Sequence, residues 1–170
     1  TLGIIGFGNV GVRLSNLVKG FDMKILVNSK SLESRKSEYP HVENVSFEDL
    51  ISKSDIISFH CKAPKDGKPM ITKEHYKKMK PTSYIINAAR GNIVDEKDLN
   101  EALNENLIAG AAVDVFSKEP TKENVLFNNP KVILTPHIAA STTEASIVVA
   151  EMVANQISDF LLKGIKINTV

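Results

Sequence analysis

The sequence predicts an α/β fold, a doubly wound parallel sheet enclosed between two layers of helices. Apolar segments of strand length alternate along the chain with amphipathic segments of helix length. A glycine-rich turn joins the first strand-like segment to the first helix-like segment, and the 170 residues are about the length of one domain. Strands that alternate with helices in this way form right-handed βαβ units, whose sheet is parallel and covered on both faces.

The predicted strands are short apolar runs bounded by polar residues, glycine or proline. The first run begins directly after Thr1, and the run at 108–115 is dense in small residues. We expect strands at 2–6, 23–27, 55–60, 83–88, 108–115 and 131–135.

The first predicted helix covers residues 9–19, directly after the glycine-rich turn. Its apolar residues recur at helical spacing, which is typical of an amphipathic helix. These residues are Val10, Leu14, Leu17, Val18 and Phe21.

Capping residues predict where three further helices begin. Ser46 starts Ser-Phe-Glu-Asp, a capping box at the head of a short helix. Thr72 is expected to cap a helix that runs through Met79 and is stopped by Pro81. Asp95 is expected to cap a helix that runs to about residue 105.

The last predicted helix is long and apolar. Ser141 starts Ser-Thr-Thr-Glu, a second capping box, and Gly164 closes the helix. The segments at 62–69 and 117–130 have no periodic pattern, so we expect irregular loops there. The apolar stripe of the helix comprises Ala145, Val149, Met152, Val153, Ile157, Phe160 and Leu161.

The composition excludes several classes of protein. A formal net charge of +1 gives no support for a nucleic-acid or anionic-membrane surface. No run of about 18 apolar residues is present, so we expect no membrane-spanning helix, and no secretory leader opens the chain. The single cysteine, Cys61, cannot form an internal disulfide, which favours a reducing compartment such as the cytoplasm. Histidine and cysteine spacings match no zinc pattern, so no metal site is predicted.

The glycine-rich turn is a G-x-G-x-x-G motif that follows a predicted strand and opens a predicted helix. Gly6 permits the tight turn, Gly8 lets the backbone approach a pyrophosphate, and Gly11 lets helix and strand pack closely. The N–H groups of Asn9 and Val10 would then face the phosphates, helped by the helix dipole. The motif therefore predicts a dinucleotide site; the alternative is a glycine-rich turn with no ligand.

The second part of a dinucleotide motif is missing. An acidic residue about 20 positions further on usually binds the ribose 2′-hydroxyl, but Ser29 occupies that place. An acid there would repel a 2′-phosphate, whereas Ser29 would not, and Lys30 could attract one. The residues leave NAD and NADP open as cofactors, and Lys30 could also be a solvated loop lysine.

Ionisable residues follow several later strands at the edge of the sheet where ligands bind. Arg90, Glu119 and His137 each come after a predicted strand, and Asp114 ends one. Hydride transfer involving an α-hydroxy acid needs a cation for the carboxylate, which Arg90 offers, and a proton acceptor, which His137 offers. Glu119 beside His137 would orient the ring and favour its charged form.

Each of these residues has an ordinary structural alternative. Arg90 could form a structural salt bridge, and a single histidine is more often a surface or capping residue. The other histidines are expected to be structural, with His41 in a polar segment, His60 at a strand end and His75 on an exposed helix face. Cys61 is expected to be a small buried apolar residue.

Four motifs in order resemble the D-isomer-specific 2-hydroxyacid dehydrogenases, and the resemblance covers essentially the whole chain. The family's Rossmann fold matches the predicted sheet. Within the family the chain looks most like the D-3-phosphoglycerate dehydrogenases. The motifs are Gly6-Phe-Gly-Asn-Val-Gly, Asn87-Ala-Ala-Arg-Gly-Asn-Ile-Val-Asp, Ala112-Val-Asp-Val-Phe-Ser-Lys-Glu-Pro and Thr135-Pro-His-Ile-Ala.

The resemblance implies a role for each matching residue. Arg90 would bind the substrate carboxylate, and Glu119 would pair with His137, the acid–base group. Asp114 would lie near the nicotinamide carboxamide, and Cys61 on the adenosine side. The implied cofactor contacts as a whole fall on Asn9, Val10, Cys61, Ala88, Ala89, Arg90, Asp114, His137, Ala139 and Ala140.

The resemblance also implies a reaction and an assembly. The expected activity is oxidation of D-3-phosphoglycerate to 3-phosphohydroxypyruvate, in serine biosynthesis, by a homodimer that binds NAD. A glyoxylate or hydroxypyruvate reductase is one alternative, and an NAD(H)-sensing corepressor-like binding module is another. Residues 1–170 would be the dinucleotide-binding domain without the family's substrate domain, so this chain is expected to bind dinucleotide but turn over poorly.

The chain departs from the family pattern at two places. Ser29 replaces the usual acidic residue, which puts the preference for NAD over NADP in doubt. The segment from His60 to Pro64 has lost the usual His-x-Pro arrangement, because its proline is displaced by two positions.

Overall fold

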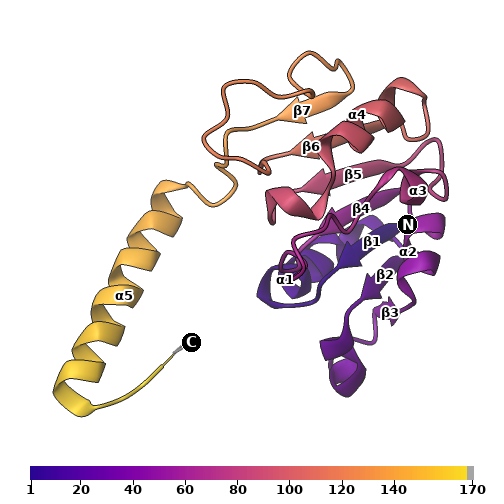
Figure 1. Cartoon of the computed structure of the whole chain (residues 1–170). Helices are drawn as coiled ribbons and strands as arrows, with labels where there is room; N and C mark the ends of the chain where they lie inside the picture. Colours follow the sequence, from indigo (N-terminus) through magenta and orange to yellow (C-terminus); the bar gives the residue numbers. More distant parts are fainter. Residues whose placement is uncertain (168–170) are drawn as a thin grey trace. The chain divides into compact units, whose positions relative to one another are not determined.

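A computed structural model describes residues 1–167 of the chain, in two compact units, Thr1–Pro136 and His137 onward. The first unit contains a seven-stranded sheet in the order β3-β2-β1-β4-β5-β6-β7, and every neighbouring pair is parallel (Figure 1). This arrangement confirms the predicted doubly wound fold. The strands are β1 Leu2–Ile5, β2 Ile25–Asn28, β3 Val42–Asn44, β4 Ile56–Phe59, β5 Tyr84–Asn87, β6 Gly110–Val113 and β7 Val132–Leu134.

Six of the seven strands coincide with predicted ones, and β3 was not predicted. This strand has three residues, two of them polar, so it shows no apolar run. It forms because Val27 of β2 pairs with Asn44, which adds a parallel edge strand to the sheet. A 3-10 helical segment between β2 and β3 was also not predicted, because its residues are almost all polar.

Helices and 3-10 segments connect the strands. Ser46 and Asp95 cap α2 and α4 as predicted, by accepting backbone N–H bonds from Asp49 and from Lys97 and Asp98. α3 is shorter than predicted. The helices are α1 Asn9–Leu17, α2 Phe47–Lys53, α3 Lys73–Tyr76, α4 Glu96–Asn104 and α5 Thr143–Lys163, and the 3-10 segments are η1 Val18–Phe21, η2 Lys30–Glu38 and η3 Gly91–Ile93.

The first predicted helix is present as α1, but its regularly spaced apolar residues are not all turned to the core, and only Leu14 and Val18 pack against it. Val10, Leu17 and Phe21 are 63%, 70% and 74% exposed. The buried residues of α1 are Gly11 and Ser15. The reason is the close approach of α1 to the sheet, which only small side chains permit.

His75 also differs from its prediction as a residue on an exposed helix face. Its Nδ1 atom accepts the backbone N–H of Thr72 at 3.1 Å, and its ring packs edge-on against Phe47. The half-buried ring therefore completes the cap of α3.

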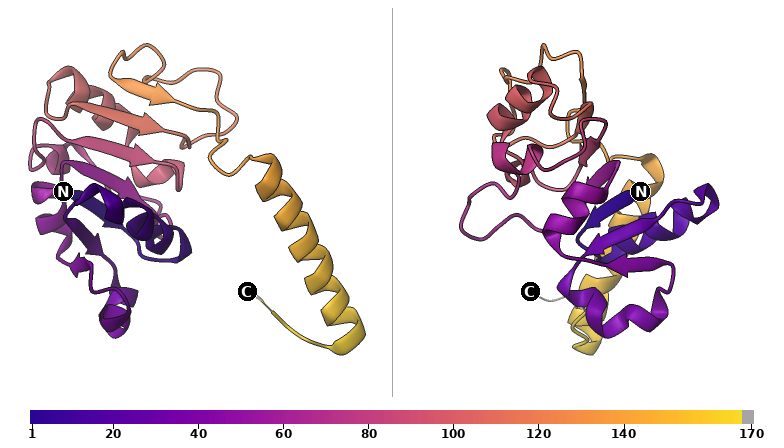
Figure 2. Two further views of the ribbon diagram at one scale, coloured as in Figure 1. Left: turned by 180° about the vertical axis from the view of Figure 1, so that it is seen from behind. Right: turned by 90° about the vertical axis from the view of Figure 1, so that its right-hand side faces the viewer.

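Two apolar clusters lie between the sheet and its helices. Figure 2 shows the sheet and these helices from two further directions. Alternate residues of β1 face opposite ways, so Ile4 joins the cluster that α1 covers and Ile5 joins the cluster that α2, α3 and α4 cover. Over β5 and β7, Tyr84, Ile86 and Ile133 remain exposed. Helices α2, α3 and α4 thus cover one face well, while the other is covered mainly over β1 and β2.

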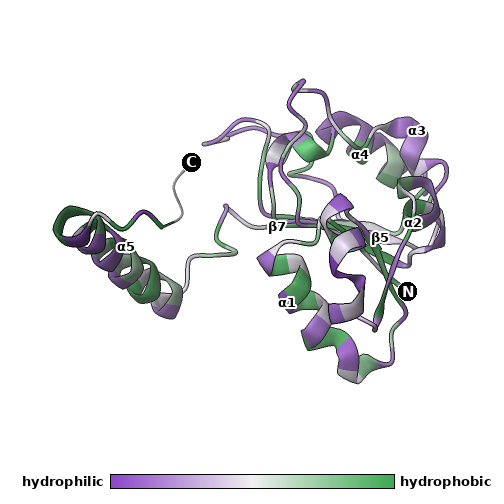
Figure 3. Cartoon of the chain, turned by 90° about the horizontal axis from the view of Figure 1, so that it is seen from below, coloured by the Kyte–Doolittle hydropathy of each residue, from purple (hydrophilic) through white to green (hydrophobic). Residues whose placement is uncertain are grey.

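The second unit is dominated by α5. Thr142, one residue after the predicted Ser141, is the N-cap, because its hydroxyl accepts the N–H of Ala145 at 3.0 Å. Gly164 closes the helix with a φ of 67°. Figure 3 shows hydrophobic and hydrophilic residues along this helix.

The length and composition of α5 are sufficient for a membrane span, which differs from the expectation that no such segment exists. Helices of water-soluble proteins often meet the same criterion. Glu151 and Asp159 interrupt the apolar residues of α5, and a carboxylate within a bilayer is costly. These two carboxylates favour an amphipathic helix over a membrane-spanning one.

Candidate functional site

The glycine-rich turn lies at the carboxyl end of β1, and each glycine has a distinct structural reason. Gly6 has a φ of 92°, and a Cβ there would lie 2.5 Å from the carbonyl oxygen of His60. A Cβ on Gly11 would lie 2.5 Å from the carbonyl oxygen of Gly6. A Cβ on Gly8 would meet nothing within 4 Å. The turn is therefore tight at Gly6 and Gly11 and leaves open space at Gly8.

The N-terminus of α1 has no side-chain cap and no acidic residue in its first turn. The N–H of Val12 bonds to the Gly8 carbonyl at 3.0 Å, so the preceding N–H groups of the helix point outward with no intrahelical acceptor. The partial positive charge of this helix end is thus not neutralised by its own residues. This geometry suits the binding of a phosphate group.

A cavity of about 500 Å³ opens beside the turn at the same edge of the sheet. It combines Val10 of the turn with the loop after β4 and the loop after β5. The exposed side chain of Val10 is thus part of the cavity wall, which accounts for its position outside the core. The lining residues are Val10, His60, Cys61, Lys62, Ala63, Ala88, Ala89 and Arg90.

His60 and Cys61 are both half-buried in the wall of this cavity. Burial lowers the pKa of His60, whose Nε2 atom lies 2.9 Å from the hydroxyl of Ser58. Burial also raises the pKa of the Cys61 thiol, and Cys61 packs against the larger apolar cluster. Both groups are therefore uncharged near neutral pH, and the loop presents a largely neutral wall next to Lys62.

The loop that carries Arg90 is shaped by Asn87, a buried residue at the end of β5. Its Nδ2 donates to the carbonyl of Arg90 at 2.9 Å, and its Oδ1 accepts the N–H of Ala89 at 3.2 Å. The Arg90 guanidinium donates to the Ala89 carbonyl at 2.6 Å and forms no ion pair with any residue from 1 to 167. The loop therefore presents an exposed, unpaired cation at the rim of the cavity.

Two loops meet at Gly91. A Cβ on Gly91 would lie 1.9 Å from the carbonyl carbon and oxygen of Phe116, so the backbone of the loop after β6 lies directly against it. That loop carries Glu119, whose Oε1 accepts the N–H of Phe116 at 2.8 Å. The contact brings the segments that carry Arg90 and Glu119 together at one edge of the sheet.

Asp114 is buried where β6 ends, as the sequence predicts. Its Oδ1 accepts the hydroxyl of Thr135 at 2.5 Å, and its N–H bonds to the Asn87 carbonyl at 2.9 Å. Thr135 follows β7, so Asp114 links three neighbouring strand ends. Glu96 fixes the loop beyond, accepting the N–H of Ser117 at 2.8 Å.

His137 is the first residue of the second unit and has a φ of 55°, in the left-handed region. A tight turn follows, in which the N–H of Ser141 bonds to the carbonyl of Ile138 at 2.9 Å. Ala139 and Ala140 lie in this turn. The pairing of His137 with Glu119, and cofactor contacts at residues 137–140, stay predictions.

The end of β2 carries neutral groups at the position where a dinucleotide motif usually has an acidic residue. The Ser29 N–H bonds to Oδ1 of Asn44 at 3.3 Å, and the Ser29 and Ser31 hydroxyls lie 3.0 Å apart. Lys30 is exposed and forms no ion pair within the described part of the chain.

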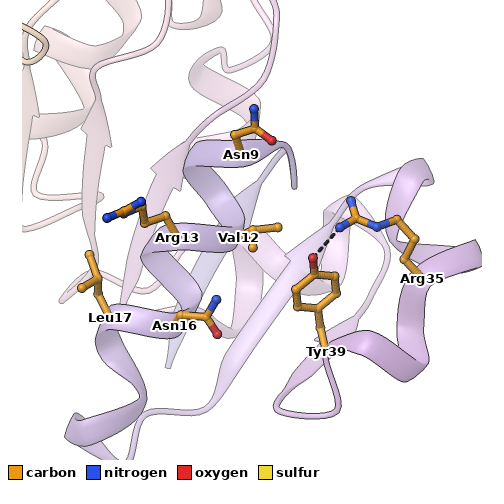
Figure 4. Close-up of a pocket in the computed structure, with 7 residues that line it drawn as sticks. All are labelled: Asn9, Val12, Arg13, Asn16, Leu17, Arg35 and Tyr39. Carbon is orange, nitrogen blue, oxygen red and sulfur yellow. Dashed lines mark hydrogen bonds between the residues drawn. The ribbon is translucent and has the colours of Figure 1, made fainter. Parts of the chain in front are cut away.

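A second hollow, of about 460 Å³, lies beside the outer face of α1 (Figure 4). Arg35 points towards Tyr39, to whose hydroxyl it donates a hydrogen bond, and its guanidinium also contacts Glu38. Arg13 points away from them on α1. The two arginines do not converge, so this hollow offers no bidentate anion site.

Comparison with known proteins agrees with this geometry. Residues 1–139 match the family model of the D-isomer specific 2-hydroxyacid dehydrogenase NAD binding domain. The chain belongs to this family. The NAD-binding role of the family fits the open space at Gly8, the unopposed helix end and the adjoining cavity.

The relatives of this NAD-binding domain include two kinds of enzyme. A glyoxylate reductase of Thermococcus litoralis is 42% identical over 170 residues, which are 100% of this chain and 51% of that protein. A D-3-phosphoglycerate dehydrogenase of Bacillus subtilis is 38% identical over 167 residues, 98% of this chain and 32% of that protein. The chain thus spans about half the length, or less, of these curated relatives.

Solved structures show the same fold. A glyoxylate reductase from Paecilomyes thermophila aligns with a TM-score of 0.87 and 30% identity, over 98% of this chain and 50% of that one. An acyclic imino acid reductase in complex with NADPH aligns with a TM-score of 0.84 and 31% identity, over 94% of this chain and 50% of that one. Other matching structures hold NAD. Both forms of the dinucleotide therefore occur in proteins similar to this domain.

Two residues important for the site were not singled out from the sequence. Asn87 and Gly91 lie near Arg90 in a motif. The carboxamide of Asn87 bonds to Ala89 and Arg90 in the same loop, whereas the role of Gly91 depends on Phe116, in the loop after β6. A buried asparagine at a strand end, three residues before a charged loop position, is a signal that could have identified Asn87.

Proposed function

We propose that this domain works in an oxidoreductase that transfers a hydride between NAD(P) and a D-2-hydroxy acid. The observation that carries the proposal is the cavity that Val10, at the uncapped N-terminal end of α1, and Arg90 both line. A dinucleotide at the turn and a carboxylate at the arginine would thus be neighbours. The dinucleotide, when bound, supplies the nicotinamide ring that exchanges the hydride.

In this proposal three side chains perform the remaining steps. Arg90 binds the substrate carboxylate with its planar fork, and the lack of an ion-pair partner for it among residues 1–167 supports this role. His137 takes the proton of the substrate hydroxyl during oxidation and returns it to the carbonyl oxygen during reduction. Glu119 orients the imidazole and stabilises its protonated form.

The substrate proposal has two candidates. The Asn87–Asp95 segment and the residues after His137 favour D-3-phosphoglycerate, the expectation from the sequence. The 42% identity with a glyoxylate reductase over the whole chain favours glyoxylate or hydroxypyruvate. We give preference to the second candidate, because Ser29 also departs from the acidic pattern of NAD-selective sites.

A substrate panel tests the reaction. The protein, in the length that the cell produces, is assayed with glyoxylate, hydroxypyruvate and 3-phosphohydroxypyruvate in the presence of NADH or NADPH. We expect reduction of glyoxylate and hydroxypyruvate to be faster than that of the phosphorylated acid. The reverse order would favour phosphoglycerate, and no reduction of any of the three would refute the proposal.

Replacing His137 separates an enzyme from a dinucleotide-sensing module. His137→Asn should lower kcat by about 100-fold or more, because the acid–base group is lost, while dinucleotide affinity stays unchanged. Ser141→Ala, in the same turn, is the matched control and should keep its activity. If the cellular role of the protein survives His137→Asn, catalysis is not that role.

A homodimer and a cytoplasmic location accompany this proposal. The exposed apolar residues Tyr84, Ile86 and Ile133 on the sheet, and the apolar residues of α5, support a further interface. The lone Cys61 supports a reducing compartment. Sedimentation of the protein would show a monomer if the dimer proposal is wrong.

A further inference from the structure

We propose that this domain binds NADP(H) in preference to NAD(H), and that Ser29, Lys30 and Ser31 hold the 2′-phosphate. The inference rests on the dinucleotide-binding role of the domain and is independent of which acid is the substrate. In this fold the end of the second strand contacts the adenosine ribose, and a carboxylate there selects against a 2′-phosphate. The structure shows which groups stand at that position instead.

The backbone at the end of β2 is held by amide groups. The Asn28 carboxamide donates to the Val45 carbonyl at 2.9 Å, and the Ser29 N–H bonds to Oδ1 of Asn44 at 3.3 Å. Both contacts are made by neutral groups, so the loop is positioned without a carboxylate. A phosphate dianion here would meet no fixed negative charge from these residues.

Two hydroxyl groups stand together at the start of η2. The Ser29 and Ser31 Oγ atoms lie 3.0 Å apart on an accessible part of the surface. One hydroxyl donates to the other, which leaves the second proton without a partner among the described residues. Hydroxyl donors of this kind suit the acceptor oxygens of a phosphate.

Lys30 lies between these serines and provides the charge. Its exposed ammonium forms no ion pair with residues 1–167, whereas Lys24, at the other end of the same strand, pairs with Glu43 at 2.9 Å. Glu33 is the nearest carboxylate in sequence, one 3-10 turn further on, and it does not pair with Lys30 within 4 Å. The cation is therefore available to an anionic ligand.

The arginine of η2 is already engaged. An Nη atom of Arg35 lies 3.4 Å from Oε2 of Glu38. The same guanidinium donates a hydrogen bond to the Tyr39 hydroxyl (Figure 4). This arrangement makes Lys30, and not Arg35, the residue that distinguishes the two dinucleotides.

Calorimetric titration of the chain with NADPH and with NADH tests the proposal without requiring turnover. We expect NADPH to bind at least about tenfold more tightly, since one added ion pair in a partly solvated site is worth about 1.4 kcal/mol. Raising the salt concentration should narrow this difference. Equal affinity, or tighter binding of NADH, would overturn the inference.

Variants identify the residues that carry the preference. Ser29→Asp should weaken NADPH binding by about tenfold or more and leave NADH binding equal or tighter. Lys30→Ala should weaken NADPH binding by about five- to tenfold with NADH affinity within twofold of the parent. If neither variant changes the ratio of the two affinities, these residues do not read the phosphate.

A matched control and a separate readout keep this result distinct from the proposed reaction. Lys36→Ala removes the same kind of charge from η2, about 12 Å further along its axis, and should leave the ratio unchanged. An NADPH preference in a protein that reduces none of the tested acids would support this inference and refute the proposed reaction. If the protein reduces one of the acids with NADH but binds NADPH and NADH with equal affinity, the proposed reaction is supported and this inference is refuted.

Discussion

The two edges of the parallel sheet hold their cationic side chains in different ways. At the amino edge every lysine next to a strand has a partner. Lys24 pairs with Glu43 at 2.9 Å, and Lys80 pairs with Asp55 at 2.7 Å. Lys131 donates to the Leu103 carbonyl at 2.6 Å and to Oδ1 of Asn106 at 2.7 Å.

At the carboxyl edge Lys30, Lys62 and Arg90 form no ion pair within the described part of the chain, although each lies within three residues of a strand end. The loop after β5 is held by the uncharged contacts of Asn87 and Gly91. In the loop after β6, the carboxylates of Glu96 and Glu119 accept backbone N–H groups. The difference indicates a division of labour. Ion pairs and hydrogen bonds engage the lysines of the amino edge, whereas these three cations of the carboxyl edge form no ion pair with residues 1–167 and, in the proposed function, are available to a ligand.

Gly91→Ala tests how strongly the carboxyl edge depends on backbone contact, and it should have the largest effect. The added Cβ would lie 1.9 Å from the Phe116 carbonyl, so one of the two loops must move. We expect a loss of about 3 kcal/mol in the free energy of unfolding, measured with urea, at any salt concentration. Dinucleotide binding should weaken as well, because Ala88–Arg90 line the cavity.

Gly20→Ala is the matched control for this change. A Cβ on Gly20 would meet nothing within 4 Å, and its φ lies outside the left-handed region. The variant should be as stable as the parent, or slightly more stable, because alanine restricts the unfolded chain. If Gly91→Ala left the free energy of unfolding as little changed as Gly20→Ala, the two loops would not be in the close contact described.

Asn87→Ala should have the second largest effect. The change removes two hydrogen bonds in a buried position and leaves the Ala89 N–H and the Arg90 carbonyl without this partner. We expect a loss of about 2 kcal/mol in unfolding free energy, again insensitive to salt, because the contacts are neutral. Urea unfolding at low and high salt measures both properties.

Asn9→Ala is the matched control for Asn87→Ala, because it removes a carboxamide from the glycine-rich turn at the same edge of the sheet. The Asn9 side chain is exposed and makes no hydrogen bond to another residue that the structure describes. Its removal should change stability by less than about 0.5 kcal/mol. A loss for Asn87→Ala as small as that would show that charged contacts, not the carboxamide, hold the loop.

The contrast between these two loops also explains which parts of the site were predictable from the sequence. The roles of Gly6 and Gly11 follow from a local requirement, a tight turn and a close helix, so the motif alone predicts them. The role of Asn87 depends on the turn that brings Ala89 and Arg90 back to its carboxamide. The role of Gly91 depends on the loop after β6, more than 20 residues further on.

The same distinction holds for the fold. Six strands are predictable because each contains an apolar run typical of a parallel sheet. This holds even for β5 and β7, where Tyr84, Ile86 and Ile133 are exposed. β3 is not predictable, because Glu43 and Asn44 belong to an edge strand with little buried surface. The buried residues of α1 could not be identified from apolar spacing for a related reason. Its contact with β1 is set by the small residues Gly11 and Ser15, whereas the apolar Val10 turns to the cavity.

Asp55→Asn tests the amino edge and should have the smallest effect, one that depends on pH. The hydrogen bond from Lys80, followed by that from the Thr1 amine, lowers the pKa of Asp55 to about 2. A carboxylate whose pKa falls on folding adds stability above its unfolded pKa of about 4, and this contribution disappears as the pH falls towards 2. Because 48% of the side chain is exposed, we expect its removal to cost less than about 1 kcal/mol.

Thermal unfolding of the parent and of Asp55→Asn between pH 2 and 7 measures this contribution. The stability difference should be constant above about pH 5, shrink below about pH 4, and decrease in high salt, because the pair lies near solvent. Asp22→Asn, at an exposed aspartate with no ion-pair partner in residues 1–167, should show no such dependence. A pH-independent difference for Asp55→Asn would mean that the amino edge, like the loop after β5, is held by uncharged contacts, and the proposed contrast between the two edges would fail.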